Sequence, residues 1–308
     1  MGRPPCCRAV PCHRRQSPHA HHSWWTNGAR GAGRCKEPVM TSPSVFELSR
    51  GTLPLLVSMP HLGTRIPEEL QPAYLPRALG VEDADWHLDR LYAFVVSMGA
   101  SVIRPLYARY VIDLNRPPDD APMYPGASNT ELCPTRFFTG ESLYREGFAP
   151  DAGERLRRRQ RYWQPYHDAL RDELQRLHAM HARVLLWDAH SIRSEIPWLF
   201  DGRLPDLNIG TADGRSAAPS ITAAVAQACA DAPGVSHVVN GRFKGGYITR
   251  QYGRPEQGVH AIQLEKCQLL YMQEHAPYAY QEARAVRIQP VLERMVGAAV
   301  RALEDLAA

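Results

Sequence analysis

The sequence predicts an α/β fold with a mostly parallel central sheet flanked by helices. The first observation behind this prediction is that short runs rich in Val, Ile and Leu recur along the chain, which is typical of strands buried on both faces of a parallel sheet. The second is that helical patterns lie between these runs, because strands alternating with helices favour this class. The chain has 308 residues, 44% of them hydrophobic and 22% charged, which suits one large domain or two small ones.

Short apolar runs are the candidate strands. We expect strands at residues 53–59, 102–103, 110–114, 184–187, 238–239 and 259–264. Pro60 ends the first run, because proline has no backbone N–H to donate to a neighbouring strand.

The candidate helices are the segments in which apolar residues recur every three or four positions. We expect helices at residues 85–96, 161–181, 217–230 and 288–306. In the second of these, one face carries Tyr162, Tyr166, Leu170, Leu174 and Leu177. Pro165 marks a start or a kink near the beginning of that helix. Residues 117–126 and 201–214 are rich in turn-forming residues and are expected to be loops.

The first 40 residues differ in composition from the rest. They contain seven Arg or Lys residues and one acidic residue, whereas the remaining chain carries 29 basic and 31 acidic residues. The body of the protein therefore gives no electrostatic reason to expect a nucleic acid partner. No apolar run approaches the roughly 20 residues that a membrane-spanning helix needs.

We expect residues 1–40 to be a disordered tail or a spurious extension from a start codon assigned too early, with Met40 as the working start. A small zinc module is the alternative, although its spacing fits no familiar pattern; its ligands would come from Cys6, Cys7, Cys12, His13, His19, His21 and His22. Residues 41–308 are then one catalytic domain. The three cysteines of that domain, Cys133, Cys229 and Cys267, are too scattered for a disulfide framework, which fits a reducing cytoplasm.

Polar residues follow the predicted strands directly. His61 comes after residues 53–59, Asn115 and Arg116 after 110–114, Asp188 and His190 after 184–187, and Glu265 after 259–264. Ligands of open parallel sheets bind at the carboxyl ends of the strands. If the strands are parallel, these side chains share one edge of the sheet.

These residue types suit a metal-dependent hydrolase. Two histidines and a carboxylate can hold zinc with a fourth position open for water, and Asp188 can fix the tautomer of His190. Glu265 can act as general base, and arginines can grip a substrate carboxylate. Each residue alone has a plainer interpretation, such as a structural hydrogen bond or a surface ion pair, so the prediction depends on their coincidence.

The acidic metal ligand is sought in the predicted helix 85–96. Asp85 and Asp89 are four residues apart and would share a helical face. The alternative is a solvated acidic edge. His87 would project away from that pair.

Several long segments resemble the N-formylglutamate deformylase family, also called N-formylglutamate amidohydrolase. The resemblance runs from about Phe46 almost to the end of the chain, in residues 60–67 (PHLGTRIP), 85–92 (DWHLDRLY), 111–120 (VIDLNRPPDD), 130–138 (TELCPTRFF), 162–170 (YWQPYHDAL), 185–211 (LLWDAHSIRSEIPWLFDGRLPDLNIGT), 241–253 (GRFKGGYITRQYG) and 259–265 (VHAIQLE). It implies a zinc-dependent, cytoplasmic enzyme of bacterial histidine degradation that converts N-formyl-L-glutamate and water to L-glutamate and formate. The implied fold is similar to that of zinc carboxypeptidases and aspartoacylases.

The resemblance also implies roles for individual residues. His61 and His190 would bind zinc with an acidic residue, Glu265 would be the base, and Asn115 with Arg116 would hold a substrate carboxylate. Carboxypeptidases take their acidic ligand a few residues after the first histidine, but here the first acid is Glu68, beyond Pro67. We therefore assign that role to Asp89, with Asp85 and Glu68 as alternatives.

Two further arginines complete the expected site. Arg193 is the candidate for stabilising the oxyanion or for binding a substrate carboxylate, and Arg250 is a further candidate for substrate binding. Arg250 lies in a segment whose glycines allow close backbone approach.

Two other functions stay open at this point. One is a deacylase of another N-acyl amino acid, with the same chemistry and zinc or another divalent metal. The other is a non-enzymatic, nucleic-acid-binding regulator that uses the basic first 40 residues. The preferred interpretation is a small-molecule enzyme with no nucleic acid or membrane partner, of open oligomeric state.

Overall fold

The computed structural model describes residues 1–2, 44–123 and 130–306. The chain divides into two units, Met1–Ser42 and Pro43–Ala308. The predictions for residues 1–40 lie outside the described residues, apart from Met1 and Gly2. Everything that follows concerns the second unit. No helix in its described part is long and apolar enough to cross a membrane.

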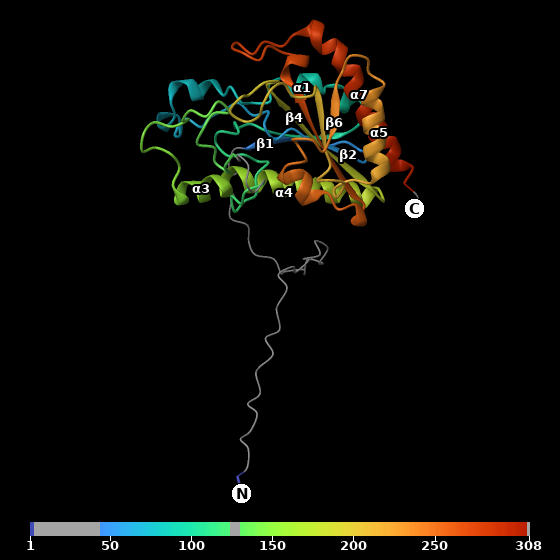
Figure 1. Cartoon of the computed structure of the whole chain (residues 1–308), viewed down its shortest axis with the longest axis horizontal. Coiled ribbons are helices and arrows are strands. Elements are labelled where there is room, and N and C mark those ends of the chain that lie inside the picture. The colour runs from blue at the N-terminus through green and yellow to red at the C-terminus, as the bar shows by residue number, and fades with distance from the viewer. Residues whose placement is uncertain (3–43, 124–129, 307–308) are drawn as a thin grey trace, which may run out of the picture. The chain divides into compact units, whose positions relative to one another are not determined.

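The second unit is built around a central sheet (Figure 1). In the described residues the sheet has seven strands in the order β1-β3-β2-β4-β7-β5-β6. The strands are β1 (Phe46–Ser49), β2 (Leu55–Ser58), β3 (Ser101–Pro105), β4 (Val184–Ile192), β5 (Leu207–Gly210), β6 (His237–Val239) and β7 (Val259–Cys267).

The sheet is mixed, so the prediction of a mostly parallel sheet is wrong. The neighbours β3, β2, β4 and β7 run parallel to one another, but β1 is antiparallel to β3 and β5 is antiparallel to β7. The sequence pattern missed β1, whose residues are partly exposed, and placed β5 inside a predicted loop. A pattern of apolar runs detects buried strands but carries no information on their direction.

Helices cover both faces of the sheet, which confirms the α/β class. One face packs against α1 (Leu88–Leu91), α2 (Phe94–Ser97), α5 (Pro219–Ala230) and α7 (Glu282–Glu304). The other packs against α4 (Gln164–Met180) and α6 (Tyr247–Tyr252), and α3 (Ala152–Arg158) leads into α4 through a π-helical turn, η3 (Arg159–Trp163). Short 3₁₀ helices are η1 (Gln71–Ala73), η2 (Pro76–Gly80), η4 (Pro255–Gln257) and η5 (Gln268–Leu270). Figure 1 shows α5 beside α7, away from α3 and α4.

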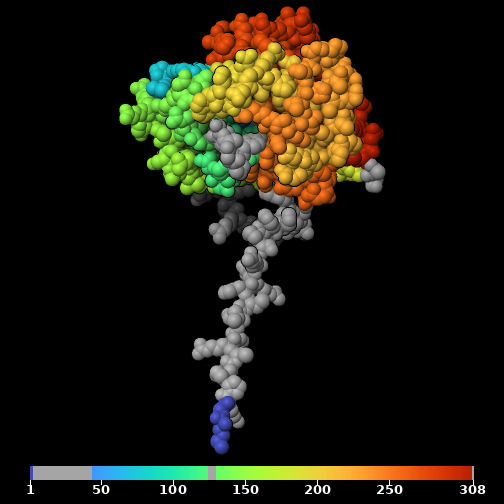
Figure 2. All heavy atoms as spheres, viewed as in Figure 1, coloured from blue at the N-terminus to red at the C-terminus, as the bar shows by residue number. Residues whose placement is uncertain are grey.

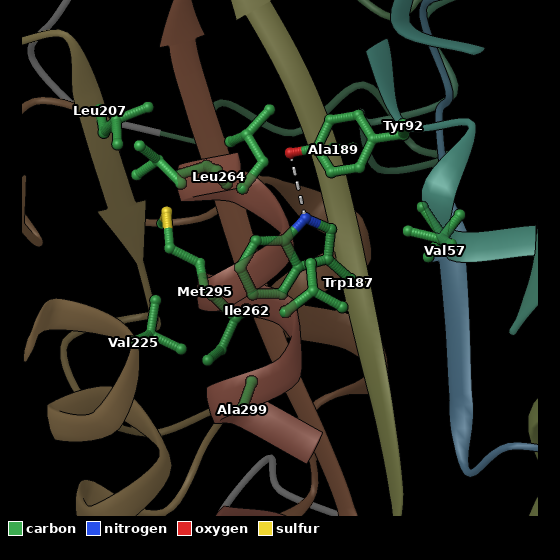
Figure 3. Close-up of a cluster of buried hydrophobic side chains, with 14 of the residues drawn as sticks. Val57, Tyr92, Trp187, Ala189, Leu207, Val225, Ile262, Leu264, Met295 and Ala299 are labelled. Carbon is green, nitrogen blue, oxygen red and sulfur yellow. Dashed lines mark hydrogen bonds between the residues drawn. The ribbon is translucent and has the colours of Figure 1, made fainter. Parts of the chain in front are cut away.

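Alternating side chains of β4 anchor the sheet in two hydrophobic cores. Leu185 and Trp187 enter the core under α5 and α7, whereas Val184 and Leu186 enter the core under α4. Trp187 is fully buried and its Nε1–H donates to the Tyr92 hydroxyl at 3.3 Å (Figure 3). Replacing such a residue by alanine typically costs about 3–5 kcal/mol. A one-residue slip would reverse this alternation, so the two cores fix the positions of the polar residues further along β4.

The predicted helices at 217–230 and 288–306 are confirmed as α5 and α7, although α7 begins earlier, at Glu282.

Two other expectations need correction. Residues 110–114 form a buried loop, not a strand. The predicted helix 85–96 begins only at Leu88, because His87 adopts a left-handed backbone conformation (φ 62°), and a turn at residues 92–93 divides it into α1 and α2. Only the part of the segment after His87 is helical.

Candidate active site

Three buried side chains converge at one end of the parallel strands. His61, Asp85 and His190 each offer one nitrogen or oxygen atom, and these atoms lie within 4.8 Å of one another. Nδ1 of His190 is 3.2 Å from Nδ1 of His61 and 3.2 Å from Oδ2 of Asp85. Nδ1 of His61 is 3.7 Å from the same oxygen. We refer to these residues as the His61–Asp85–His190 cluster.

Different segments bring the cluster together. His61 lies in the turn after β2, and its carbonyl accepts a hydrogen bond from the Asp85 N–H at 3.0 Å. His190 lies inside β4, opposite Glu265 of β7. The strands therefore run further than predicted, and His190 and Glu265 belong to the sheet itself.

The surroundings of His61 fix its tautomer. Its Nε2 lies 2.7 Å from Oδ1 of Asp113, a carboxylate that can only accept. Its Nδ1 lies 3.3 Å from Nη1 of Arg109, a guanidinium that can only donate. We therefore assign the proton to Nε2, and the Nδ1 lone pair faces Asp85 and His190.

His190 has a similar partner on its other side. Its Nε2 lies 3.2 Å from Oδ2 of Asp188 and 2.9 Å from Nδ2 of Asn115. The Asn115 amide is oriented by Oδ1, which accepts from the Ile248 N–H at 2.8 Å. A Cβ at residue 246 would lie 2.3 Å from the Asn115 Nδ2, so this close approach needs Gly246. The Nε2 of His190 thus faces one acceptor, the Asp188 carboxylate, and one donor, the Asn115 amide nitrogen. A neutral His190 that carries its proton on Nε2, toward Asp188, presents its Nδ1 lone pair to the cluster.

The two histidines differ in protonation in this metal-free arrangement. Burial and the nearby Arg109 lower the pKa of His61. Burial also opposes the charged form of His190, but Asp188 and Asp85 outweigh it and raise the His190 pKa to about 10. A cation bound at Nδ1 would take the place of that proton.

A cavity of about 290 Å³ opens beside the cluster. Its lining includes Arg109, Asn115, Arg116, Arg242, Gln263 and Glu265. On the face shown in Figure 2 the surface is hollowed between the yellow segment near residue 200 and the orange segment near residue 245. Leu199 and Phe243 line the cavity from these two segments.

Glu265 is the carboxylate best placed for acid–base chemistry. Its side chain reaches the cavity, and its Oε1 has no hydrogen-bond partner in the described part of the chain. Burial raises the pKa of Glu265 to about 8. A buried, unpartnered carboxylate with a raised pKa next to a candidate metal cluster is a functional-site feature.

Of the predicted arginines, only Arg116 lines the cavity. Its guanidinium donates to the carbonyls of Asn115 (2.9 Å) and Thr130 (3.0 Å), and also to the Thr130 hydroxyl. Arg193 is bound to Asp83 at 2.9 Å, and Arg250 donates to the Gly245 carbonyl at 2.7 Å. Neither of these two is among the described residues that line the cavity.

Sequence reasoning missed two arginines of the cavity, Arg109 and Arg242. Arg109 precedes Asp113 by four residues and pairs with it at 2.6 Å, a spacing that could have drawn attention to it. Arg242 lies in the segment 241–253, in which only Arg250 was selected.

The acidic member of the cluster is Asp85, not the predicted Asp89. The Asp89 side chain is 47% exposed and pairs with Arg104 at 2.7 Å. Because His87 breaks the helix, Asp85 lies ahead of α1 and the two aspartates do not share a helical face. The other alternative, Glu68, is exposed and also lies outside the cluster.

The chain is similar in sequence to known proteins. A family model described as N-formylglutamate amidohydrolase matches residues 53–272. The chain is 51% identical over 256 residues to an N-formylglutamate deformylase of Pseudomonas aeruginosa, a match that covers 82% of this chain and 96% of that protein. It is 49% identical over 254 residues to the N-formylglutamate deformylase of Pseudomonas putida, with coverage of 82% and 95%.

A solved structure has a similar fold. The crystal structure of an N-formylglutamate amidohydrolase from Ralstonia eutropha JMP134 superposes with a TM-score of 0.70 at 25% identity, and the match covers 84% of this chain and 97% of that one. The family match spans most of the chain and includes every member of the cluster. The chain belongs to the N-formylglutamate amidohydrolase family.

Proposed function

We propose that this protein hydrolyses N-formyl-L-glutamate to L-glutamate and formate with a bound divalent metal, zinc. The observation that carries the proposal is the His61–Asp85–His190 cluster beside the unpartnered carboxylate of Glu265. The names of the relatives from the two Pseudomonas species support the choice of substrate.

The donor atoms fit zinc. Two imidazole nitrogens and one carboxylate oxygen are a usual catalytic zinc set, which leaves a coordination position open. Asp113 and Asp188 lie on the far sides of the two imidazoles, where carboxylates orient zinc-binding histidines.

The buried charges around the cluster also fit a divalent cation. Four buried carboxylates surround it, those of Asp85, Asp113, Asp188 and Glu265. Two buried cations lie among them, Arg109, which pairs with Asp113, and Lys266, whose ammonium donates to the His190 carbonyl. Unbalanced buried charge is costly. Without a metal, the raised pKa values of His190 and Glu265 keep one proton on each and so offset the two remaining negative charges; a divalent cation would take the place of these two protons.

The residues of the cavity account for the rest of the chemistry. Zinc, when bound, supplies a Lewis acid that polarises the carbonyl and makes water a stronger acid. Glu265 takes a proton from the attacking water, whose oxygen bonds to the formyl carbon, and returns it to the amine as the C–N bond breaks. Its raised pKa suits a group that both accepts and releases a proton near neutral pH. Arg109, at the same cavity, provides N–H donors toward the negative charge that develops on the formyl oxygen.

Arg116 is the proposed partner of the carboxylate nearest the scissile amide. It borders the cavity, and its present hydrogen bonds go to neutral acceptors. Asn115 also borders the cavity, but its amide is bonded to the Ile248 N–H and lies against His190. We therefore assign Asn115 to holding His190 and Asp188 in place.

Other predictions from the sequence remain proposals. They are the likeness to zinc carboxypeptidases and aspartoacylases, the place in histidine degradation, the cytoplasmic location, and the assignment of catalysis to residues 41–308. Protein that starts at Met40 should match the full chain in activity if the last of these is correct.

The test is formate release from N-formyl-L-glutamate by the full chain, before chelation, after chelation and after zinc is restored. Release that stops with chelator and returns with zinc supports both reaction and metal. A folded, zinc-loaded protein that releases no formate but cleaves other N-acyl amino acids would move the function to the deacylase alternative. Inactivity on every acyl substrate would remove the enzyme proposal.

A further inference from the structure

The cavity is lined by more arginines than the proposed chemistry at the formyl group needs. Three arginines line it, Arg109, Arg116 and Arg242. Arg109 is buried and neutralised by its 2.6 Å ion pair with Asp113. Within residues 44–123 and 130–306, neither Arg116 nor Arg242 forms an ion pair with a carboxylate. The cavity lining therefore includes two arginines that form no direct ion pair in these residues.

These two guanidiniums lie at different depths. Arg116 is half-buried and follows Asn115, whose Nδ2 is 2.9 Å from Nε2 of His190. Arg242 is exposed and comes from the loop between β6 and α6. Arg116 is thus next to the reaction centre, and Arg242 is at the solvent side of the cavity.

Aromatic rings hold Arg242 in place. Its guanidinium carbon lies 5.3 Å from the ring centroid of Phe200 and 5.9 Å from that of Phe243. Phe200 is buried, and both phenylalanines belong to an apolar cluster with Ile192, Ile196 and Leu204. A guanidinium that is packed against aromatic rings loses less conformational entropy when it binds a carboxylate. Its planar arrangement of N–H donors can form two parallel hydrogen bonds to a carboxylate.

The proposed substrate carries its two carboxylates at two distances from the bond that breaks. The α-carboxylate is attached to the carbon that bears the amide nitrogen, and the side-chain carboxylate lies two methylene groups further on. When the formyl carbon lies beside the His61–Asp85–His190 cluster, the nearby α-carboxylate is assigned to Arg116. We propose that Arg242 binds the side-chain carboxylate and is the residue that selects acidic N-acyl amino acids. This inference rests on the proposed function and adds the substrate class that the cavity accepts.

The test compares N-formyl-L-glutamate with N-formyl-L-glutamine, which has the same shape and no side-chain charge. Wild-type protein should prefer the glutamate compound in kcat/KM. Arg242→Gln should lower kcat/KM for the glutamate compound about 30-fold, mainly through KM, as expected when charge-assisted hydrogen bonds are lost. It should leave the glutamine compound nearly unchanged, so that the preference disappears. Arg242→Lys keeps the positive charge but lacks the planar guanidinium that binds a carboxylate through two N–H groups. This variant should restore part of the preference for the glutamate compound.

Arg287→Gln is the matched control, because Arg287 is an exposed arginine on α7 and does not line the cavity. It should keep the wild-type preference. An Arg242→Gln protein that keeps the wild-type preference while remaining active overturns the inference.

Calorimetry of L-glutamate binding to zinc-loaded protein separates this inference from the proposed reaction. Weaker binding to Arg242→Gln than to wild type supports the role of Arg242 even in a protein that releases no formate. Equal binding to the two proteins counts against it whatever the activity.

Discussion

Nδ1 of His61 and Nδ1 of His190 lie 3.2 Å apart, and both face Oδ2 of Asp85. Two lone pairs and a carboxylate oxygen at such distances repel one another unless a proton or a cation lies between them. In the metal-free protein the proton is on His190, whose pKa Asp188 and Asp85 raise to about 10 against the effect of burial. A bound metal ion and the His190 proton therefore compete for the same position between these three atoms.

This competition predicts that zinc affinity rises with pH. Displacement of one proton from His190 should strengthen binding about tenfold per pH unit between about pH 6.5 and 8.5, because metal binding releases that proton. Titration calorimetry in two buffers of different ionisation enthalpy would count the protons released. An affinity that does not change with pH would show that His190 is neutral before the metal binds.

The metal-free protein should also lose stability as pH rises from about 7 to 8. The folded-state pKa of His190 is raised from 6.5 to about 10, and that of Glu265 from 4.5 to about 8. A group with a raised folded-state pKa contributes stability that is fully present below its unfolded pKa and is lost as pH rises through the folded value. Thermal melts in the presence of a chelator should show a falling Tm over this range. Zinc-loaded protein should show a smaller fall, since zinc replaces the His190 proton.

Asp85→Asn and Asp89→Asn form a matched pair that tests the identity of the acidic ligand. Asp85→Asn should weaken zinc binding about 100-fold or more, because changes even to residues behind the ligands cost 10–100-fold. Asp89→Asn loses only a surface ion pair with Arg104, which is worth about 1 kcal/mol or less. Zinc content after dialysis and kcat/KM should fall together in the first variant only. The reverse pattern would restore Asp89 as the ligand.

The contrast between these two aspartates shows what the sequence could and could not predict. The apolar runs led to His61, His190 and Glu265, which the structure brings to one cavity, because buried strands have a strong sequence pattern. Asp85 could not be preferred over Asp89, since the choice depends on the left-handed backbone of His87, which helical periodicity does not reveal. Arg109 and Arg242 were missed because the sequence pattern around an arginine that lines a cavity does not differ from the pattern around an arginine on the surface. The antiparallel strand β1 was missed because its residues are partly exposed, and β5 because it lies among turn-forming residues.

Glu265→Gln should abolish turnover and leave zinc bound. The amide keeps the size of the side chain but cannot accept the proton of the attacking water. We expect kcat to fall about 1000-fold, within the range that general base catalysis contributes, with zinc content unchanged by elemental analysis. Substantial activity in a zinc-loaded Glu265→Gln protein would remove Glu265 from the mechanism, and loss of zinc would make it a ligand.

Trp163→Phe should weaken substrate binding from outside the cavity. The Trp163 indole donates its Nε1–H to the Arg116 carbonyl at 3.0 Å and stacks on His167, with the ring centroids 3.7 Å apart. His167 in turn bonds to the Leu114 carbonyl at 2.8 Å, so the π-helical turn and the start of α4 hold both ends of the segment that carries Arg116. Phenylalanine keeps a stacking ring but not the donor, and a hydrogen bond of about 1 kcal/mol corresponds to a KM increase of about fivefold.

In Trp163→Phe, kcat should change less than KM, because Glu265 and the His61–Asp85–His190 cluster do not contact the indole. Trp198→Phe is the matched control, since Trp198 is 47% exposed, and it should leave both constants unchanged. Steady-state kinetics on N-formyl-L-glutamate, with Tm measured for each variant, separates the two effects. A Trp163→Phe protein with a lower Tm and an unchanged KM would mean that the indole stabilises the fold and does not position Arg116.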